Sequence, residues 1–253
     1  MRKSKTLARI RQGEAIRTCV LGHYIPGYLA HAARAGYDCV WLDMEHRALS
    51  IRELQSILAH AHLHDIDVMV RPPTLEKTGL YRYLEDGVAG LLIPHVSTVE
   101  KARMLVQATK FPPLGDRGID NAGLDSDFNL HDPDDYTAWA NQETFLTVII
   151  ETPEAVHNVD AIAAVEGVDM IFIGPGDLGL RLRQTKEMSI DDAWEIVAKA
   201  CQKHGKAFGG PAFSLDEMKK RRNQGAQLLV NNSEFVNFAD GLQRNGALFN
   251  ELS

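Results

Sequence analysis

Short apolar segments rich in β-branched residues alternate with amphipathic stretches along the whole chain. Because these segments lack strict polar alternation, they are typical of parallel strands that are covered on both faces. Repetition of strand and helix predicts parallel strands joined by right-handed crossovers. The predicted strands are residues 18–21, 39–42, 68–70, 90–93, 146–150, 170–173, 207–209 and 228–230.

The intervening stretches have the apolar spacing of helices, and many end at a glycine, the common left-handed stop of an α-helix. Eight strand–helix units in a chain of 253 residues predict an α/β fold, a closed (β/α)8 TIM barrel. An open doubly wound sheet is the second possibility, although no G-x-G-x-x-G sequence follows an early strand. The predicted helices are residues 26–35, 50–64, 78–85, 98–110, 153–165, 191–204, 214–223 and 234–252.

Two segments fall outside this repeat. Residues 2–12 predict a short helix ahead of the first strand, placed to cover the bottom of the barrel. Residues 111–143 contain several prolines and glycines and predict a long loop, which in a compact domain is more often functional than idle. No segment has the composition of a linker, so we expect residues 1–253 to form a single domain.

Composition narrows the class of protein. The chain has 27 Lys and Arg residues against 34 Asp and Glu, a formal net charge of −7, which argues against nucleic-acid binding. No apolar run approaches the ~18 residues of a membrane span, and no apolar stretch follows the basic N-terminus, so we expect no signal peptide. Cys19, Cys39 and Cys201 are far apart and odd in number, which favours reduced thiols and a cytoplasmic protein.

Ionisable residues follow five successive predicted strands at their carboxyl ends. In a (β/α)8 barrel this end carries the active site. The residues are Asp43, Glu45, His46, Arg71, His95, Glu151 and Asp177.

Glu151 and Asp177 end neighbouring strands, whose backbones would lie about 4.8 Å apart. Two carboxylates at that separation repel unless they share a proton or a cation. All-oxygen ligation with room for water suits Mg²⁺ or Mn²⁺, with Co²⁺ also possible. The glycine-rich turn of residues 174–179 adds backbone N–H groups suited to hold a small carboxylate. The alternative is that each carboxylate only caps the helix that follows it.

Arg71 and His46 each have a chemical and a structural interpretation. Arg71 precedes two prolines that stiffen the turn, so its guanidinium is suited to a developing enolate oxygen. It is equally suited to a structural salt bridge with Asp43 or Glu45. His46 lies among acids and is a candidate general base, or else a polar loop histidine.

The order of these segments resembles the HpcH/HpaI aldolase family, the metal-dependent class II pyruvate aldolases such as 2-dehydro-3-deoxyglucarate aldolase. The resemblance extends from about residue 13 to residue 240, and its most specific block is F-I-G-P-G-D-L at 172–178. Residues 231–234, N-N-S-E, depart from the usual Gly-x-Asp pattern. The other matching blocks are W-L-D-M-E-H at 41–46, V-R-P at 70–72, G-L-L-I-P-H-V at 90–96, F-P-P-L-G at 111–115 and I-E-T-P-E-A at 150–155.

The resemblance implies that a divalent metal ion, Mg²⁺, Mn²⁺ or Co²⁺, is held by Glu151 and Asp177. It implies that Arg71 binds the pyruvate oxygen and steadies the enolate. It also implies that the backbone N–H groups of Gly176 and Asp177 receive the pyruvate carboxylate.

The resemblance further implies that His46, held by Asp43, serves the acid–base step through a water molecule. Members of the family assemble as hexamers, trimers of dimers, in which a C-terminal helix is exchanged between paired subunits. We therefore expect a homo-oligomer that acts on small molecules, with no nucleic-acid or membrane partner.

The activity expected from the resemblance is that of a carbon–carbon lyase. Such an enzyme cleaves a 4-hydroxy-2-oxo acid reversibly to pyruvate and an aldehyde through a pyruvate enolate. A Schiff-base route lacks its amine, because Lys206 stands at the amino-terminal end of its predicted strand. The alternatives are a CoA-ester lyase of the citrate-lyase type and a non-catalytic barrel that binds a 2-oxo acid. Oxaloacetate decarboxylation would be a side activity of the same enolate chemistry.

Overall fold

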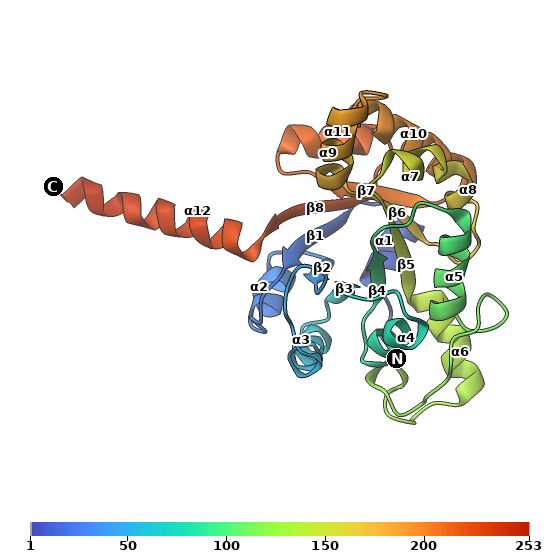
Figure 1. Ribbon diagram of the computed structural model, residues 1–253. Coiled ribbons are helices and arrows are strands. Elements are labelled where there is room, and N and C mark those ends of the chain that lie inside the picture. The colour runs from blue at the N-terminus through green and yellow to red at the C-terminus, as the bar shows by residue number, and fades with distance from the viewer. Residues whose placement is uncertain (1, 253) are drawn as a thin grey trace.

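The computed structural model describes residues 2–252, and Met1 and Ser253 lie outside the described part. Eight parallel strands close into a barrel in sequence order, surrounded by helices (Figure 1). The strands are β1 (Ile16–Leu21), β2 (Cys39–Asp43), β3 (Asp67–Arg71), β4 (Gly90–Ile93), β5 (Phe145–Ile150), β6 (Met170–Ile173), β7 (Ala207–Pro211) and β8 (Leu228–Ser233). The predicted (β/α)8 barrel is confirmed, and the open sheet is wrong because β8 pairs with β1.

The helices alternate with the strands. Short 3₁₀ turns η1 (Leu124–Ser126) and η2 (Leu248–Leu252) accompany them. The α-helices are α1 (Lys5–Arg11), α2 (Tyr28–Arg34), α3 (Ile51–Leu63), α4 (Lys77–Glu85), α5 (Val99–Thr109), α6 (Pro133–Glu143), α7 (Pro153–His157), α8 (Val159–Ala163), α9 (Pro175–Thr185), α10 (Ile190–His204), α11 (Leu215–Asn223) and α12 (Glu234–Ala247).

Apolar side chains pack in two layers, one inside the barrel and one between strands and helices. Ile16 and Phe172 belong to the inner layer, whereas Leu42 and Ile57 belong to the outer layer. Full burial of such a side chain stabilises the fold by about 1.5–3 kcal/mol. Leu7 of α1 packs with the inner layer, so the predicted N-terminal helix does cover one end of the barrel.

Two of the predicted helix boundaries are wrong. The long loop ends earlier than expected, because residues 133–143 form α6; Asp132 caps this helix and Pro133 occupies its first turn. The helix predicted over residues 153–165 is interrupted at Asn158, whose side-chain amide donates to the main-chain oxygen of Ser97. Both features depend on contacts that a local pattern does not contain.

The glycine-rich turn at 174–179 is also more regular than predicted, because it forms the first half of α9. Pro175 fits the first turn of a helix, and Leu178 and Leu182 bury one face. Gly174 begins the helix without a side-chain cap. The segment therefore presents the open N-terminus of a helix to the barrel end.

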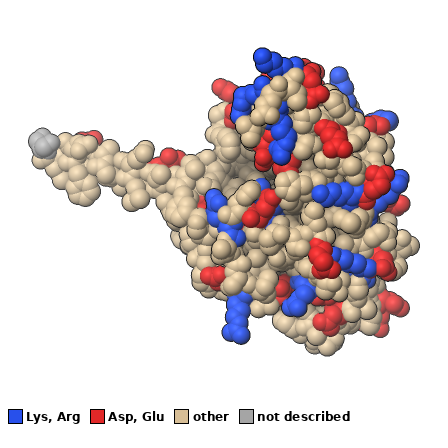
Figure 2. Space-filling model, viewed as in Figure 1, with Lys and Arg blue, Asp and Glu red and all other residues tan. Residues whose placement is uncertain are grey.

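The last helix leaves the barrel. Helix α12 projects away from it as an arm (Figure 1), and Figure 2 shows few charged side chains along this arm. The start of the arm is anchored to the barrel, where the buried carboxylate of Glu234 accepts from the Gly22 N–H at 2.9 Å and faces His23 Nδ1 at 2.7 Å. Its exposed apolar residues include Phe235, Phe238, Leu242, Leu248 and Phe249. Within residues 2–252, no helix is both long and apolar enough to cross a membrane.

Candidate active site

Asp43 and Arg71 form the first cluster at the carboxyl ends of the strands. They are register partners at the ends of β2 and β3. Arg71 donates from Nε and Nη2 to the two carboxylate oxygens of Asp43, at 3.0 and 2.9 Å, and its Nε also lies 3.1 Å from Glu45 Oε2. The structural salt bridge considered for Arg71 is present, and it fixes the direction of the guanidinium.

The pKa of Asp43 reflects this contact. Burial alone would raise that pKa, but the hydrogen bonds and charge of Arg71, together with two backbone N–H groups, lower it overall. Asp43 is therefore ionised at neutral pH and keeps Arg71 in place. The indole ring of Trp41 adds a second support, since the Arg71 guanidinium lies 4.9 Å from its centroid.

His95, just beyond β4, connects two acidic residues. Its ring Nδ1 lies 2.9 Å from Glu151 Oε1, and its Nε2 lies 3.1 Å from Glu45 Oε1. Its backbone N–H donates to the same Glu151 oxygen at 2.6 Å. The backbone at His95 is left-handed, with φ of 59°, an uncommon conformation for a side chain of this size. This strained conformation brings both the N–H and the ring onto Glu151.

His46 lies at the rim, and 58% of its side chain is exposed. The expected support from Asp43 does not reach the imidazole, because Asp43 Oδ1 accepts from the His46 backbone N–H at 3.3 Å. The ring instead has Glu45 Oε2 at 3.6 Å from Nε2. Asp43 thus orders the main chain that carries His46.

Glu151 directly follows β5, and Asp177 lies in the first turn of α9, the helix that follows β6; the two side chains differ widely in exposure. The Glu151 side chain is 5% exposed, whereas that of Asp177 is 51% exposed. Gly174 permits this packing, because a Cβ there would come within 3.0 Å of the Glu151 Cβ. Burial raises the pKa of Glu151; His95 opposes the shift, and the negative charges of Asp177 and Glu45 add to it.

These two carboxylates fit a divalent metal ion. A cation would offset both the burial of Glu151 and its repulsion by Asp177. Among residues 2–252, no group of three or more His, Cys, Asp or Glu side chains forms a metal cage. Two protein carboxylates with other positions left to water and substrate suit Mg²⁺ or Mn²⁺ better than a closed structural site.

The N-terminus of α9 lies next to this pair. Gly176 and Asp177 occupy its first turn, where backbone N–H groups have no partner within the helix. Such N–H groups and the helix dipole attract anions. The arrangement agrees with a carboxylate site at Gly176 and Asp177, which remains a prediction.

Three contributions escaped sequence reasoning. His95 and Glu45 were located at strand ends, but their contacts with Glu151 and Arg71 depend on a left-handed residue and on the barrel register. Arg181 was not recognised at all, although it follows Asp177 by four residues. Once α9 is known to be helical, that spacing puts the two side chains on one face.

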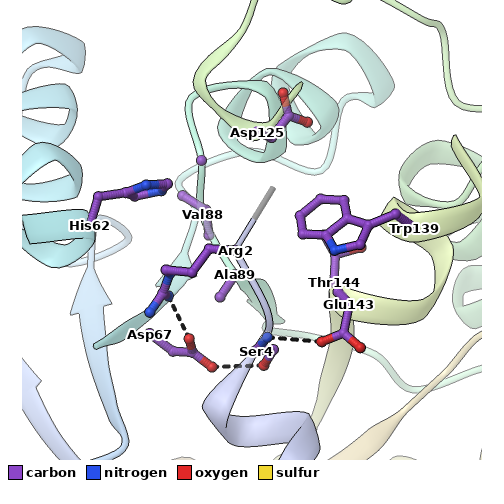
Figure 3. Close-up of a pocket in the computed structure, with 11 residues that line it drawn as sticks. Arg2, Ser4, His62, Asp67, Val88, Ala89, Asp125, Trp139, Glu143 and Thr144 are labelled. Carbon is purple, nitrogen blue, oxygen red and sulfur yellow. Dashed lines mark hydrogen bonds and ion pairs between the residues drawn. The ribbon is translucent and has the colours of Figure 1, made fainter. Parts of the chain in front are cut away.

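An enclosed cavity at the opposite, amino-terminal end of the barrel is not a second active site. It has a volume of about 20 Å³, room for about one water molecule. Figure 3 shows the contacts among its lining residues: Arg2 contacts Asp67 at 2.5 Å, and Ser4 donates to Asp67 from its hydroxyl and to Glu143 from its N–H. These contacts attach the N-terminal segment to the barrel.

Comparison with known proteins agrees with this geometry. A hydroxypyruvate/pyruvate aldolase of Deinococcus radiodurans is 38% identical over 75% of this chain and 68% of its own length. A 2-keto-3-deoxy-L-rhamnonate aldolase of Klebsiella pneumoniae is 31% identical over 88% of this chain and 84% of its own length. The crystal structure of an HpcH/HpaI aldolase from Desulfitobacterium hafniense superposes with a TM-score of 0.89 at 28% identity, covering 97% of this chain and 96% of that one. The family model for HpcH/HpaI aldolase/citrate lyase matches residues 23–239, and the chain belongs to this family.

Proposed function

We propose that this protein is a metal-dependent aldolase, a carbon–carbon lyase that reversibly cleaves a 4-hydroxy-2-oxo acid to pyruvate and an aldehyde. The observation that carries the proposal is the pairing of Glu151 with Asp177 beside the open N-terminus of α9. A cation site and an anion site thus adjoin, which is what a 2-oxo acid requires. The named aldolase relatives support the same reaction class.

Glu151 and Asp177 would hold the metal ion, Mg²⁺, Mn²⁺ or Co²⁺. When bound, the ion would polarise the 2-oxo group and stabilise the charge of the enolate. The N–H groups of Gly176 and Asp177 bind the substrate carboxylate, and Arg71 orients and steadies the keto oxygen.

Proton transfer in the cleavage direction starts at the hydroxyl on C4. His46, through a water molecule, accepts that proton; the C3–C4 bond breaks, and the aldehyde leaves with its new carbonyl. The electron pair remains on the pyruvate fragment, and a proton added at C3 completes pyruvate. Asp43 is a positioning residue for both Arg71 and the main chain at His46.

Hydrogen–deuterium exchange at the methyl group of pyruvate, followed by NMR in D₂O, tests the proposal without a choice of aldehyde. Metal-stripped protein should show no exchange above background, and Mg²⁺, Mn²⁺ or Co²⁺ should restore it. Glu151→Gln and Asp177→Asn should abolish exchange. The matched control is Glu154→Gln, an exposed carboxylate in the first turn of α7, which should keep it. Full exchange in Glu151→Gln would contradict the assignment.

Two other functions give different results in the same assay series. A CoA-ester lyase would cleave malyl-CoA or citramalyl-CoA and not the free 4-hydroxy-2-oxo acids. A barrel that only binds 2-oxo acids would bind pyruvate with metal yet show neither exchange nor turnover. Oxaloacetate decarboxylation would accompany aldol activity and fall with it in Asp177→Asn.

We further propose that the protein is a homo-oligomer, a hexamer built from dimers that exchange α12. A groove of about 400 Å³ between α2 and α11 lies on the outside of β8 and β1, where the eighth helix of a barrel normally packs. The chain's own α12 projects elsewhere with an exposed apolar face. A partner's α12 is therefore the occupant that fits. The three cysteines are free and buried, in keeping with a reducing cytoplasm.

A further inference from the structure

Arg181 connects the two members of the proposed metal pair. Its Nη1 donates to Asp177 Oδ1 at 3.1 Å and to the main-chain oxygen of Glu151 at 3.4 Å. The residue lies in the second turn of α9, and its side chain is 40% exposed. The guanidinium therefore joins the start of α9 to the end of β5, the two segments that carry the carboxylates.

The contact uses one oxygen of Asp177 and leaves the other. Within residues 2–252, no donor faces Asp177 Oδ2, which belongs to a side chain that is 51% exposed. Glu151 is held in the same way, since the N–H and the ring of His95 both lie on Oε1 and no donor of the described chain lies on Oε2. Each carboxylate of the pair thus has one committed oxygen and one uncommitted oxygen.

The number of free oxygens bears on which cation the pair suits. Ca²⁺ takes about 6–8 oxygen ligands and often binds a carboxylate through both of its oxygens. Mg²⁺ demands near-octahedral geometry, keeps several waters and uses one or two carboxylates, and Mn²⁺ takes similar octahedral oxygen sites. Two carboxylates that each offer a single oxygen therefore suit the smaller ions better than Ca²⁺.

We propose that Arg181 is a positioning residue that biases the site toward Mg²⁺ and Mn²⁺ and against Ca²⁺ by occupying Asp177 Oδ1. This inference rests on the proposed function, because that function assigns the metal ion to Glu151 and Asp177. Arg181 acts through Asp177 and transfers no proton. Its effect on the choice of ion is modest, since a partly exposed arginine–carboxylate pair four residues apart is a weak contact.

The choice of cation is measured without substrate. Titration of the protein with Mn²⁺, followed by electron paramagnetic resonance of the free ion, gives the Mn²⁺ affinity, and competition with Ca²⁺ gives the Ca²⁺ affinity. Arg181→Met is the test variant, because methionine keeps the helix propensity but has no donor. Arg183→Met, at an exposed arginine of the same helix, is the matched control.

Arg181→Met should lower the ratio of the Mn²⁺ affinity to the Ca²⁺ affinity about twofold to fivefold. Loss of a positive charge beside the site raises the affinity for both divalent ions alike, so that effect cancels in the ratio. Arg183→Met should leave the ratio at its wild-type value. A ratio that is unchanged in Arg181→Met, or lowered equally in Arg183→Met, would overturn the inference.

A conservative variant tests the contact itself. Arg181→Lys keeps a donor four residues after Asp177 and should keep the ratio close to that of the wild type. A ratio as low as in Arg181→Met would overturn the inference, because a donor on Oδ1 would then not be the cause. The aldolase proposal fails separately, if the wild-type protein binds Mn²⁺ but shows no exchange at the pyruvate methyl group. A wild-type protein that binds no Mn²⁺ would refute the metal pair and this inference with it.

Discussion

His95 contacts Glu151 at two points, through its backbone N–H at 2.6 Å and through its ring Nδ1 at 2.9 Å, and both contacts fall on the same carboxylate oxygen. One side of the Glu151 carboxylate is thereby fixed, and its other oxygen is left for a cation. Hydrogen bonds that orient a metal ligand commonly matter for affinity almost as much as the ligand itself. His95 is thus a positioning residue for the proposed metal site.

His95→Gly should weaken Mn²⁺ binding about tenfold to a hundredfold. Glycine keeps the N–H donor and adopts the left-handed backbone without strain, so only the ring contacts with Glu151 and Glu45 are lost. Calorimetry or electron paramagnetic resonance of Mn²⁺ measures the change without any substrate. His157→Gly, at an exposed histidine of α7, is the control; an unchanged affinity in His95→Gly would mean that the ring does not orient Glu151.

Arg71→Lys should lower kcat for aldol cleavage by about 10²-fold, the usual cost of losing one donor that faces a developing oxyanion. Lysine keeps the charge but cannot span both oxygens of Asp43 in the planar geometry of the fork. Steady-state kinetics with the metal at saturation measures the effect. If kcat is retained and only KM rises, Arg71 contributes to substrate binding but not to enolate stabilisation.

Asp43→Asn should lower the free energy of unfolding at pH 7 by about 2 kcal/mol, since Arg71 loses the carboxylate that binds both its Nε and Nη2 and keeps the contact with Glu45. The pKa of Asp43 is lowered in the folded protein, so its contribution is complete above its unfolded pKa and is lost as the pH falls through the lower, folded pKa. Urea denaturation between pH 7 and pH 3 should show wild type and variant converging at the acidic end. A difference that grows on acidification would contradict this sign.

Charges on the arm should disrupt the proposed helix exchange. Phe238 and Leu242 are exposed in the isolated chain. Phe238→Glu combined with Leu242→Glu should dissociate the oligomer, because the two introduced glutamates would be buried in the interface as unpaired charges. Light scattering coupled to gel filtration gives the mass. Gln243→Glu, on the same helix, is the control; a mass unaffected by the double variant would argue against packing of this face on a partner.

The comparison of sequence and structure separates local from distant causes. Strand positions were predictable because a strand that is buried on both faces has a continuous apolar run. For Gly90–Ile93 and Met170–Ile173, both predicted ends match the structure. Helix α9 was missed because its glycines have poor helix propensity; packing of Leu178 and Leu182 outweighs that cost. Helix α6 had a readable start at Asp132 and Pro133, but the surrounding proline- and glycine-rich sequence hid it.

The amino-acid sequence by itself determined the barrel, the family and the end of the barrel that carries the acids, because apolar periodicity and strand-end residues are local properties of the chain. Tertiary structure alone decided which groups touch. Asp43 contacts the guanidinium of Arg71 and not the ring of His46, since strand register pairs Asp43 with Arg71. Arg181 reaches Asp177 only because α9 is helical, and His95 reaches Glu151 only because its backbone is left-handed.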